Sequence, residues 1–189
     1  MVEAGKKRGD VYRGRVSRLG TRELCRMYDV LCAGDNLPGW PPGRALEYLV
    51  LRAFQLEGAK VTWPYEVRHR DVLLEQVDGA VYCDGLTCLI ETKAYAQPLD
   101  YLPVSRMKAR LLRRPRTVLG AVFTLEGFTE AFVLLAETLP PPDVLLWSGK
   151  DIAWALRRRA MRTGLRRKHR YAIEHGFPHL PLTQKEGTS

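Results

Sequence analysis

A predicted tight hairpin is the feature of this sequence that most constrains its fold. Asp84-Gly85 stands between two β-prone runs, and Asp-Gly in that setting is the strongest short signal for a two-residue turn. If these two residues form the turn, Cys83 pairs with Leu86, and counting outward places Asp78 opposite Glu91. Directly opposed side chains share one face of a hairpin, with Cβ atoms about 4.5–5.5 Å apart. The sequence therefore predicts two carboxylates in one place.

A lysine joins this pair. Lys93 follows Glu91 by two residues, so its side chain leaves the strand on the same face. Two like charges in opposed positions destabilise a sheet, and an ionised group at the end of an apolar strand is costly unless it is paired or binds a metal. The pattern predicts a metal site suited to attack on a phosphate. The alternative is an ordinary turn at Asp78-Gly79 beside a solvated strand face.

The pattern Asp-x12-Glu-x-Lys over a hairpin resembles the PD-(D/E)XK nucleases, the restriction-endonuclease-like superfamily, although Val77 replaces the proline. The family has a helix with a glutamate upstream, and Glu47 in the apolar-periodic segment after Gly43 corresponds to it. Three later segments resemble the strand–helix–strand part of Mrr-like members. The similarity covers about residues 40–158, and the three later segments are 117–124, 127–131 and 144–152.

This resemblance implies a catalytic set of Glu47, Asp78, Glu91 and Lys93. Asp78, Glu91 and the backbone carbonyl of Thr92 would hold Mg²⁺, for which Mn²⁺ would substitute, since oxygen ligands suit these ions and argue against zinc. Lys93 would orient or help deprotonate the attacking water and stabilise charge on the phosphate. Glu47 would bind the metal through water; the alternative for Glu47 is a charge on the helix surface.

The positive charge is concentrated outside the middle of the chain. The net charge is +9, and residues 150–170 carry nine Lys or Arg residues against one acidic residue. Such segments are typical of proteins with a polyanionic partner, although a solvated helix face is the alternative. The predicted nucleic-acid-binding residues come from this segment and from residues 106–116, and they are Arg106, Lys108, Arg110, Arg113, Arg114, Arg159, Arg162 and Arg166.

Strand and helix signals alternate along the chain and predict an α/β fold of the three-layer sandwich type, with a central mixed β-sheet flanked by helices, restriction-endonuclease-like. We expect a basic, partly disordered arm over residues 1–20, a core domain over 21–158 and a basic helical extension and tail over 159–189. One strand is expected over 60–67. One long helix begins at Asp151, and Ile152, Leu156, Ala160 and Leu165 share its apolar face.

These observations predict a Mg²⁺-dependent endonuclease that hydrolyses phosphodiester bonds of DNA, in restriction, repair or a mobile element. The alternatives are a Holliday-junction resolvase or other structure-specific nuclease, an RNase on the same scaffold, and a nucleic-acid-binding module that does not cleave. We expect a homodimer, because one such site serves one phosphate at a time, and a protein partner could supply specificity. No stretch has the roughly 18 apolar residues of a membrane span, so a cytoplasmic, nucleoid-associated location is expected.

Overall fold

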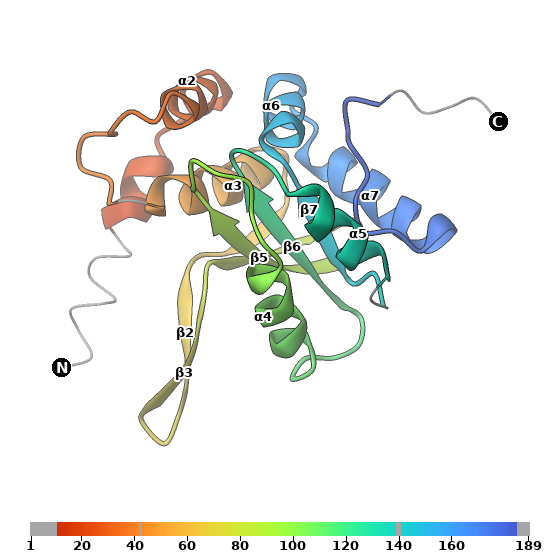
Figure 1. Ribbon diagram of the computed structural model, residues 1–189. Helices are drawn as coiled ribbons and strands as arrows, with labels where there is room; N and C mark the ends of the chain where they lie inside the picture. Colours follow the sequence, from red (N-terminus) through yellow and green to blue (C-terminus); the bar gives the residue numbers. More distant parts are fainter. Residues whose placement is uncertain (1–10, 42, 139–140, 185–189) are drawn as a thin grey trace.

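The computed structural model describes residues 11–41, 43–138 and 141–184. They form a central five-stranded sheet with helices on both faces (Figure 1). The strand order is β1-β4-β5-β6-β7, with antiparallel pairing from β1 to β5 and parallel pairing from β5 to β7. The predicted α/β class with a mixed central sheet is confirmed. The strands are β1 (Lys60–Thr62), β2 (Tyr65–His69), β3 (Val72–Val77), β4 (Gly79–Cys83), β5 (Leu86–Lys93), β6 (Val118–Thr124) and β7 (Val144–Trp147).

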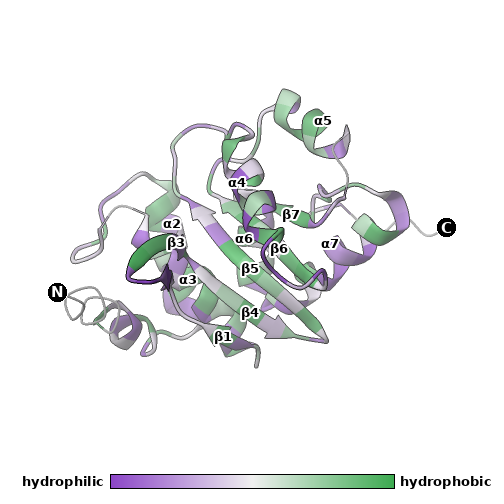
Figure 2. Ribbon diagram, turned by 90° about the horizontal axis from the view of Figure 1, so that it is seen from below, coloured by the Kyte–Doolittle hydropathy of each residue, from purple (hydrophilic) through white to green (hydrophobic). Residues whose placement is uncertain are grey.

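Helices cover the two faces of the sheet unequally. The larger apolar core lies between the sheet and one layer of helices, and it includes Leu49 of α3 and Ile152 of α6. A smaller core lies under the opposite layer and includes Met107 of α4 and Phe132 of α5. In Figure 2, much of the sheet between these layers is green, the colour of hydrophobic residues. The helices are α2 (Thr21–Cys32), α3 (Arg44–Leu56), α4 (Leu102–Leu111), α5 (Glu130–Thr138), α6 (Gly149–Arg158) and α7 (Met161–His175).

The predicted hairpin is present in its predicted register. Cys83 pairs with Leu86, and the two turn residues Asp84 and Gly85 both have positive φ, 50° and 76°. Positive φ at both positions defines the type I′ turn that matches the twist of a hairpin. Gly79, at the far end of β4, has φ 151°, and a Cβ there would lie 2.7 Å from Leu51 Cδ1. Asp78 is therefore followed by a position that only glycine occupies without strain.

The strand expected over residues 60–67 is divided in two. β1 pairs with β4 in the main sheet, but the chain leaves that sheet at Trp63-Pro64, and β2 pairs with β3 instead. Proline lacks the N–H that a continuing ladder needs, which explains the break. The two-stranded sheet of β2 and β3, residues 65–77, projects from the body of the domain (Figure 1). We call it the β2–β3 arm.

The expectations for the two ends of the chain need correction. Residues 11–16 are helical and Val16 is fully buried, so the second half of the expected arm is ordered, while residues 1–10 lie outside the described part. The long helix expected from Asp151 is two helices, because Arg159 adopts a left-handed conformation, φ 52° and ψ 51°. The N-cap of the first of these helices, α6, is Ser148 rather than Asp151, and Asp151 lies three residues later in a capping box. α7 packs on the same core as α6, so the chain does not separate into a core and an extension at residue 158.

Over the described residues, no helix combines the length and the apolar character needed to cross a membrane.

Candidate functional site

Asp78 and Thr92 are hydrogen-bonded to each other at the end of the β4–β5 hairpin that lies opposite its turn. The register pairs Gly79 with Ile90, so Asp78 lies opposite Glu91 as predicted. Asp78 Oδ2 accepts hydrogen bonds from the Thr92 backbone N–H at 2.8 Å and from Thr92 Oγ1 at 3.2 Å. Two donors on one oxygen hold the Asp78 carboxylate against the end of β5. This arrangement leaves Oδ1 as the oxygen to bind a cation or water.

Glu91 is the most buried carboxylate of the group, with 4% of its surface exposed. Its Oε1 accepts from Lys93 Nζ at 2.6 Å, and its Oε2 forms a short ion pair with Arg110 of α4. A buried carboxylate with both oxygens engaged by cations is electrostatically compensated. The sequence predicts that Arg110 binds phosphate, and the structure instead places it on Glu91.

Glu47 approaches the same site from the first turn of α3. Its carboxylate pairs with Arg44 Nη1 at 2.7 Å. Burial and the nearby Asp78 carboxylate raise the pKa of Glu47 to about 7, against the opposing effects of Arg44 and Lys93. Burial and Glu91 likewise raise the pKa of Asp78, although the Thr92 hydrogen bonds and Lys93 oppose the change. Asp78 therefore interacts electrostatically with both Glu47 and Glu91, and burial of these like charges disfavours the ionised forms of Asp78 and Glu47.

Lys93 sits among these groups as a cation. Burial alone would lower its pKa, but Glu91 and Asp78 raise it above the usual lysine value. Lys93 is therefore an ammonium at neutral pH and acts as a hydrogen-bond donor. The structure brings together all four residues of the predicted catalytic set, from α3, β5 and the residue that precedes β4.

The donor chemistry of this cluster fits Mg²⁺, because it offers carboxylate oxygens whose charge the fold only partly neutralises. The positions of the described side chains do not form a complete set of metal ligands. Within the described ranges, no three or more His, Cys, Asp or Glu side chains are grouped closely enough to hold a metal ion. Glu91 is turned toward Lys93 and Arg110, and Glu47 toward Arg44. Metal binding at this cluster would require Glu91 to exchange at least one of its cationic partners for the ion.

Thr124 is a site residue that the sequence did not reveal. It ends β6 and pairs in parallel register with Lys93, so the two side chains emerge on the same face of the sheet. Thr124 is fully buried, and its Oγ1 has no hydrogen-bond partner within the part of the chain that is described. A threonine at the end of an apolar strand carries no distinctive sequence signal, and only the β5–β6 register places it beside the lysine.

The basic residues predicted between positions 106 and 116, which follow the site in sequence, mostly form ion pairs inside the molecule. Arg113 and Arg114 both bind Glu75 of β3, which is 8% exposed, and Lys108 binds Asp143 at 3.2 Å. Together with Arg110, four of the five basic residues predicted here for nucleic acid have carboxylate partners. Arg106 is exposed. The sequence missed Glu75 because its partners lie 38 and 39 residues further along the chain.

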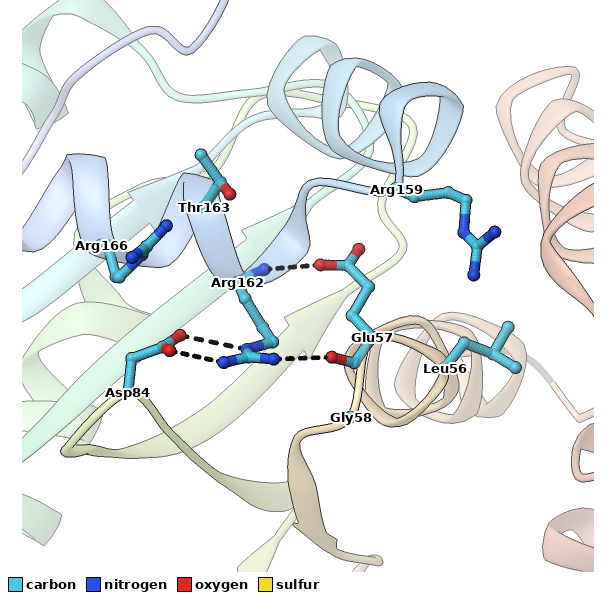
Figure 3. Close-up of a pocket in the computed structure, with 8 residues that line it drawn as sticks. All are labelled: Leu56, Glu57, Gly58, Asp84, Arg159, Arg162, Thr163 and Arg166. Carbon is cyan, nitrogen blue, oxygen red and sulfur yellow. Dashed lines mark hydrogen bonds and ion pairs between the residues drawn. The ribbon is translucent and has the colours of Figure 1, made fainter.

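The three predicted arginines of the C-terminal region line a separate pocket of about 590 Å³ (Figure 3). Arg162 donates to both oxygens of Asp84 and to the Glu57 carbonyl at 2.8 Å. The Glu57 carboxylate accepts from the N–H groups of Met161 and Arg162, at 2.7 and 3.0 Å, and so caps α7. Arg159 and Arg166 flank this network and are exposed.

This pocket and the carboxylate cluster lie at opposite ends of β5. The pocket borders the Asp84 turn just before β5, and the cluster surrounds Glu91 and Lys93 at its other end. Eight strand residues span roughly 26 Å at about 3.3 Å each. The structure therefore does not bring the two sets of predicted site residues together, and one small ligand cannot contact both.

The fold and the site together define an α/β domain whose mixed sheet carries a half-buried cluster of carboxylates with an ammonium at one end. No protein-family model and no curated protein matches the chain. Among solved structures, it is similar to a protein of unknown function, AF1548, with 19% identity, a TM-score of 0.45, and coverage of 58% of this chain and 57% of that one. It is also similar to the MspJI restriction endonuclease in complex with a 27-mer oligonucleotide, with 18% identity and a TM-score of 0.40.

The second match covers 88% of this chain and 37% of the MspJI chain. This chain thus spans well under two thirds of the length of either protein. Both TM-scores are below 0.5, so the two matches decide neither the family nor the activity of this chain, and the functional argument depends on the site.

Proposed function

We propose that this chain is a Mg²⁺-dependent nuclease that hydrolyses phosphodiester bonds of DNA. One observation carries the proposal: Asp78, Glu91 and Lys93 converge at the open end of one hairpin, with Glu47 close enough for Asp78 to raise its pKa. Perturbed titratable groups that cluster with an adjacent cation are typical of catalytic sites.

In the proposed site, Asp78, Glu91 and the Thr92 carbonyl hold the metal, and Glu47 contributes through water. The ion would neutralise charge on the phosphate under attack. Lys93 donates a hydrogen bond to the attacking water or to a phosphate oxygen, since its raised pKa keeps it protonated. Arg110, which the sequence assigned to DNA, pairs with Glu91 and holds its carboxylate in place.

The experiment that tests the proposal offers supercoiled plasmid, linear duplex, single strands and a four-way junction, each with Mg²⁺, Mn²⁺ or EDTA. Cleavage that requires the metal supports it, and the preferred substrate separates an unspecific or sequence-directed nuclease from a junction resolvase. The same assay with RNA tests the RNase alternative. Full activity in EDTA, or no cleavage of any substrate with either metal, contradicts it.

One observation favours a second candidate, a nucleic-acid-binding module without activity. Both oxygens of Glu91 already have cationic partners, so the cluster is a stable ion-pair network without a metal. In that case the same substrates bind but remain uncut, and calorimetric titration with Mn²⁺ gives no binding that depends on Asp78. The two candidates therefore differ in a measurement that does not require turnover.

A further inference from the structure

Thr124 carries a hydroxyl group that the fold buries without a partner. The residue is fully buried, and within the described part of the chain its Oγ1 accepts or donates no hydrogen bond. Nearly all buried side-chain hydroxyls in folded proteins have a partner, and an unsatisfied one costs stability. Valine has nearly the same shape and lacks this cost, so packing alone does not explain a threonine at this position. The hydroxyl points to a partner that it gains in another state of the site.

The β5–β6 register places Thr124 beside Lys93. The two strands are parallel, and these residues pair at the carboxyl end of the ladder. Paired residues of adjacent strands project to the same face of a sheet, and on this face Val122 of β6 joins the smaller core. In open α/β sheets, ligands bind at the carboxyl ends of the strands. Thr124 therefore shares both the face and the end of the sheet with the carboxylate cluster.

The segments that follow β5 and β6 are tied to each other, which constrains the distance between the two strand ends. Leu99 N–H donates to the Gly127 carbonyl at 2.9 Å, and Thr129 N–H donates to the Leu99 carbonyl at 3.3 Å. These contacts make a parallel bridge between Leu99 and Phe128. Side chains at the two strand ends are thus presented by backbone that is held on both sides. A precisely placed hydrogen bond requires this kind of support.

The hydrogen bond between Lys93 and Glu91 competes with metal binding. Glu91 Oε2 is paired with Arg110, and Asp78 Oδ2 is bound by Thr92. The oxygen of Glu91 that faces Lys93 is Oε1, 2.6 Å from Nζ. Either the lysine or the arginine must release Glu91 for a metal ion. Lys93 has an unpartnered acceptor in register beside it, so its contact is the one expected to open.

We propose that Thr124 positions Lys93 once Glu91 has turned to a metal ion. In the metal-free protein Lys93 donates to Glu91. In the metal-bound protein Lys93 donates one N–H to Thr124 Oγ1 and keeps the other two for the attacking water and the phosphate. The cost of the unpartnered hydroxyl is then relieved as the metal binds. Thr124 is a positioning residue, and this inference rests on the proposed function, because it specifies how the same site rearranges.

Calorimetric titration of the full chain with Mn²⁺ tests this exchange without turnover. Thr124→Val should weaken Mn²⁺ binding about tenfold, the equivalent of one hydrogen bond to a charged group. The thermal unfolding midpoint of the metal-free protein should stay the same or rise, because an unsatisfied hydroxyl is removed. Thr124→Ser keeps the hydroxyl and should bind Mn²⁺ like the wild type. Thr87→Val is the matched control, since Thr87 pairs with Val118 at the other end of the same ladder.

A double-mutant cycle shows whether the hydroxyl acts through the lysine. In a Lys93→Ala background no ammonium competes for Glu91, so Thr124→Val should leave Mn²⁺ affinity unchanged there. If Thr124→Val weakens binding as much in this background as in the wild type, the hydroxyl acts on the metal or on packing, and the proposal is wrong. Equal weakening in Thr124→Ser or in Thr87→Val overturns it as well.

The wild-type titration separates this inference from the proposed function. A wild-type chain that binds no Mn²⁺ overturns the metal site of the proposed function, and the role of Thr124 with it. A wild-type chain that binds Mn²⁺ with an affinity that Thr124→Val does not change leaves the metal site standing and overturns only the role of Thr124.

Discussion

Glu91 accepts a hydrogen bond from Lys93, with Oε1 and Nζ 2.6 Å apart, while its other oxygen is paired with Arg110. Two residues that are neighbours on one strand face thus form an ion pair at the place where the proposed reaction needs a metal and a charged donor. The pair stabilises the site without a metal, and either this pair or the contact with Arg110 must open when a metal binds. Each side chain around it can be tested separately.

Lys93→Ala should reduce the rate of cleavage strongly and leave metal affinity nearly unchanged, because the ammonium serves the attacking water and the developing charge. The measurements are single-turnover cleavage and calorimetric titration with Mn²⁺. Lys60→Ala is the control, as Lys60 is an exposed lysine that pairs with Tyr82 at the other end of the hairpin from Lys93. Loss of metal binding or unfolding of the Lys93 variant would show that the lysine is only the ion-pair partner of Glu91.

Asp78→Ala or Glu91→Ala should abolish cleavage and leave DNA binding unchanged or tighter, since each substitution removes a metal ligand and a charge that repels phosphate. Binding is measured by fluorescence anisotropy in Ca²⁺ or EDTA, and cleavage in Mg²⁺. Asp143→Ala removes a carboxylate that pairs with Lys108 away from the cluster, and it should retain activity. Activity in either site variant would contradict the metal assignment.

The metal-free protein should lose stability as pH rises through about 7, because the pKa of Glu47 is raised there by burial and by Asp78. The folded state then holds a proton that the unfolded state, with an ordinary glutamate pKa near 4.3, has released. This stabilising contribution of Glu47 is fully present at a pH below its pKa in the unfolded state. It is lost as the pH rises above its pKa in the folded state. Its ceiling is about 4 kcal/mol, at about 1.4 kcal/mol for each pKa unit.

Glu47→Gln isolates this effect, since the other titratable groups remain in both proteins. The difference in free energy of unfolding between wild type and Glu47→Gln should change between pH 5 and 8 in the direction that favours the variant at high pH. Glu130→Gln, in the first turn of α5 and exposed, is the matched control. A flat difference across this range would mean that Glu47 is not held in a charged, buried cluster.

Lys168→Met should destabilise the fold by about 3–5 kcal/mol, the usual cost of leaving a buried charge unpaired. Lys168 is fully buried on Asp151, with Nζ and Oδ2 3.0 Å apart, and Asp151 Oδ1 accepts from the Leu182 N–H at 2.6 Å. Thermal unfolding measures the loss, with the exposed Lys150→Met as control. The double variant Lys168→Met with Asp151→Asn should recover part of it, and strictly additive losses would argue against coupling.

Arg159→Gln with Arg166→Gln should weaken DNA binding similarly for unrelated sequences. The salt slope of binding should fall by about 0.9 for each phosphate that the protein no longer neutralises. Affinity is measured at several salt concentrations. Arg162→Gln serves as the comparison, because this arginine binds Asp84 and Glu57 and should mainly change stability. An unchanged slope in the double variant would show that these arginines form a solvated helix face.

Local signals in the sequence were sufficient for the hairpin and for the residues it aligns. Asp84-Gly85 specifies its own turn, and the two-residue period of a strand then places Asp78 opposite Glu91 and Lys93 on the same face. The order of strand and helix signals likewise predicted the mixed sheet with helices on both faces. These features depend on interactions between residues close in sequence, and turn chemistry and periodicity record such interactions directly.

Only the tertiary structure decided the partners of the charged side chains. Arg110 binds Glu91, Arg113 and Arg114 bind Glu75, and Arg162 binds Asp84 across 78 residues of chain. A sequence shows how many charges a chain has, but an ion pair depends on which elements pack together. For the same reason it did not show Thr124 beside Lys93, the break at Arg159, or the β2–β3 arm. The sequence by itself determined which groups could do chemistry, and packing decided which of them remain free to do it.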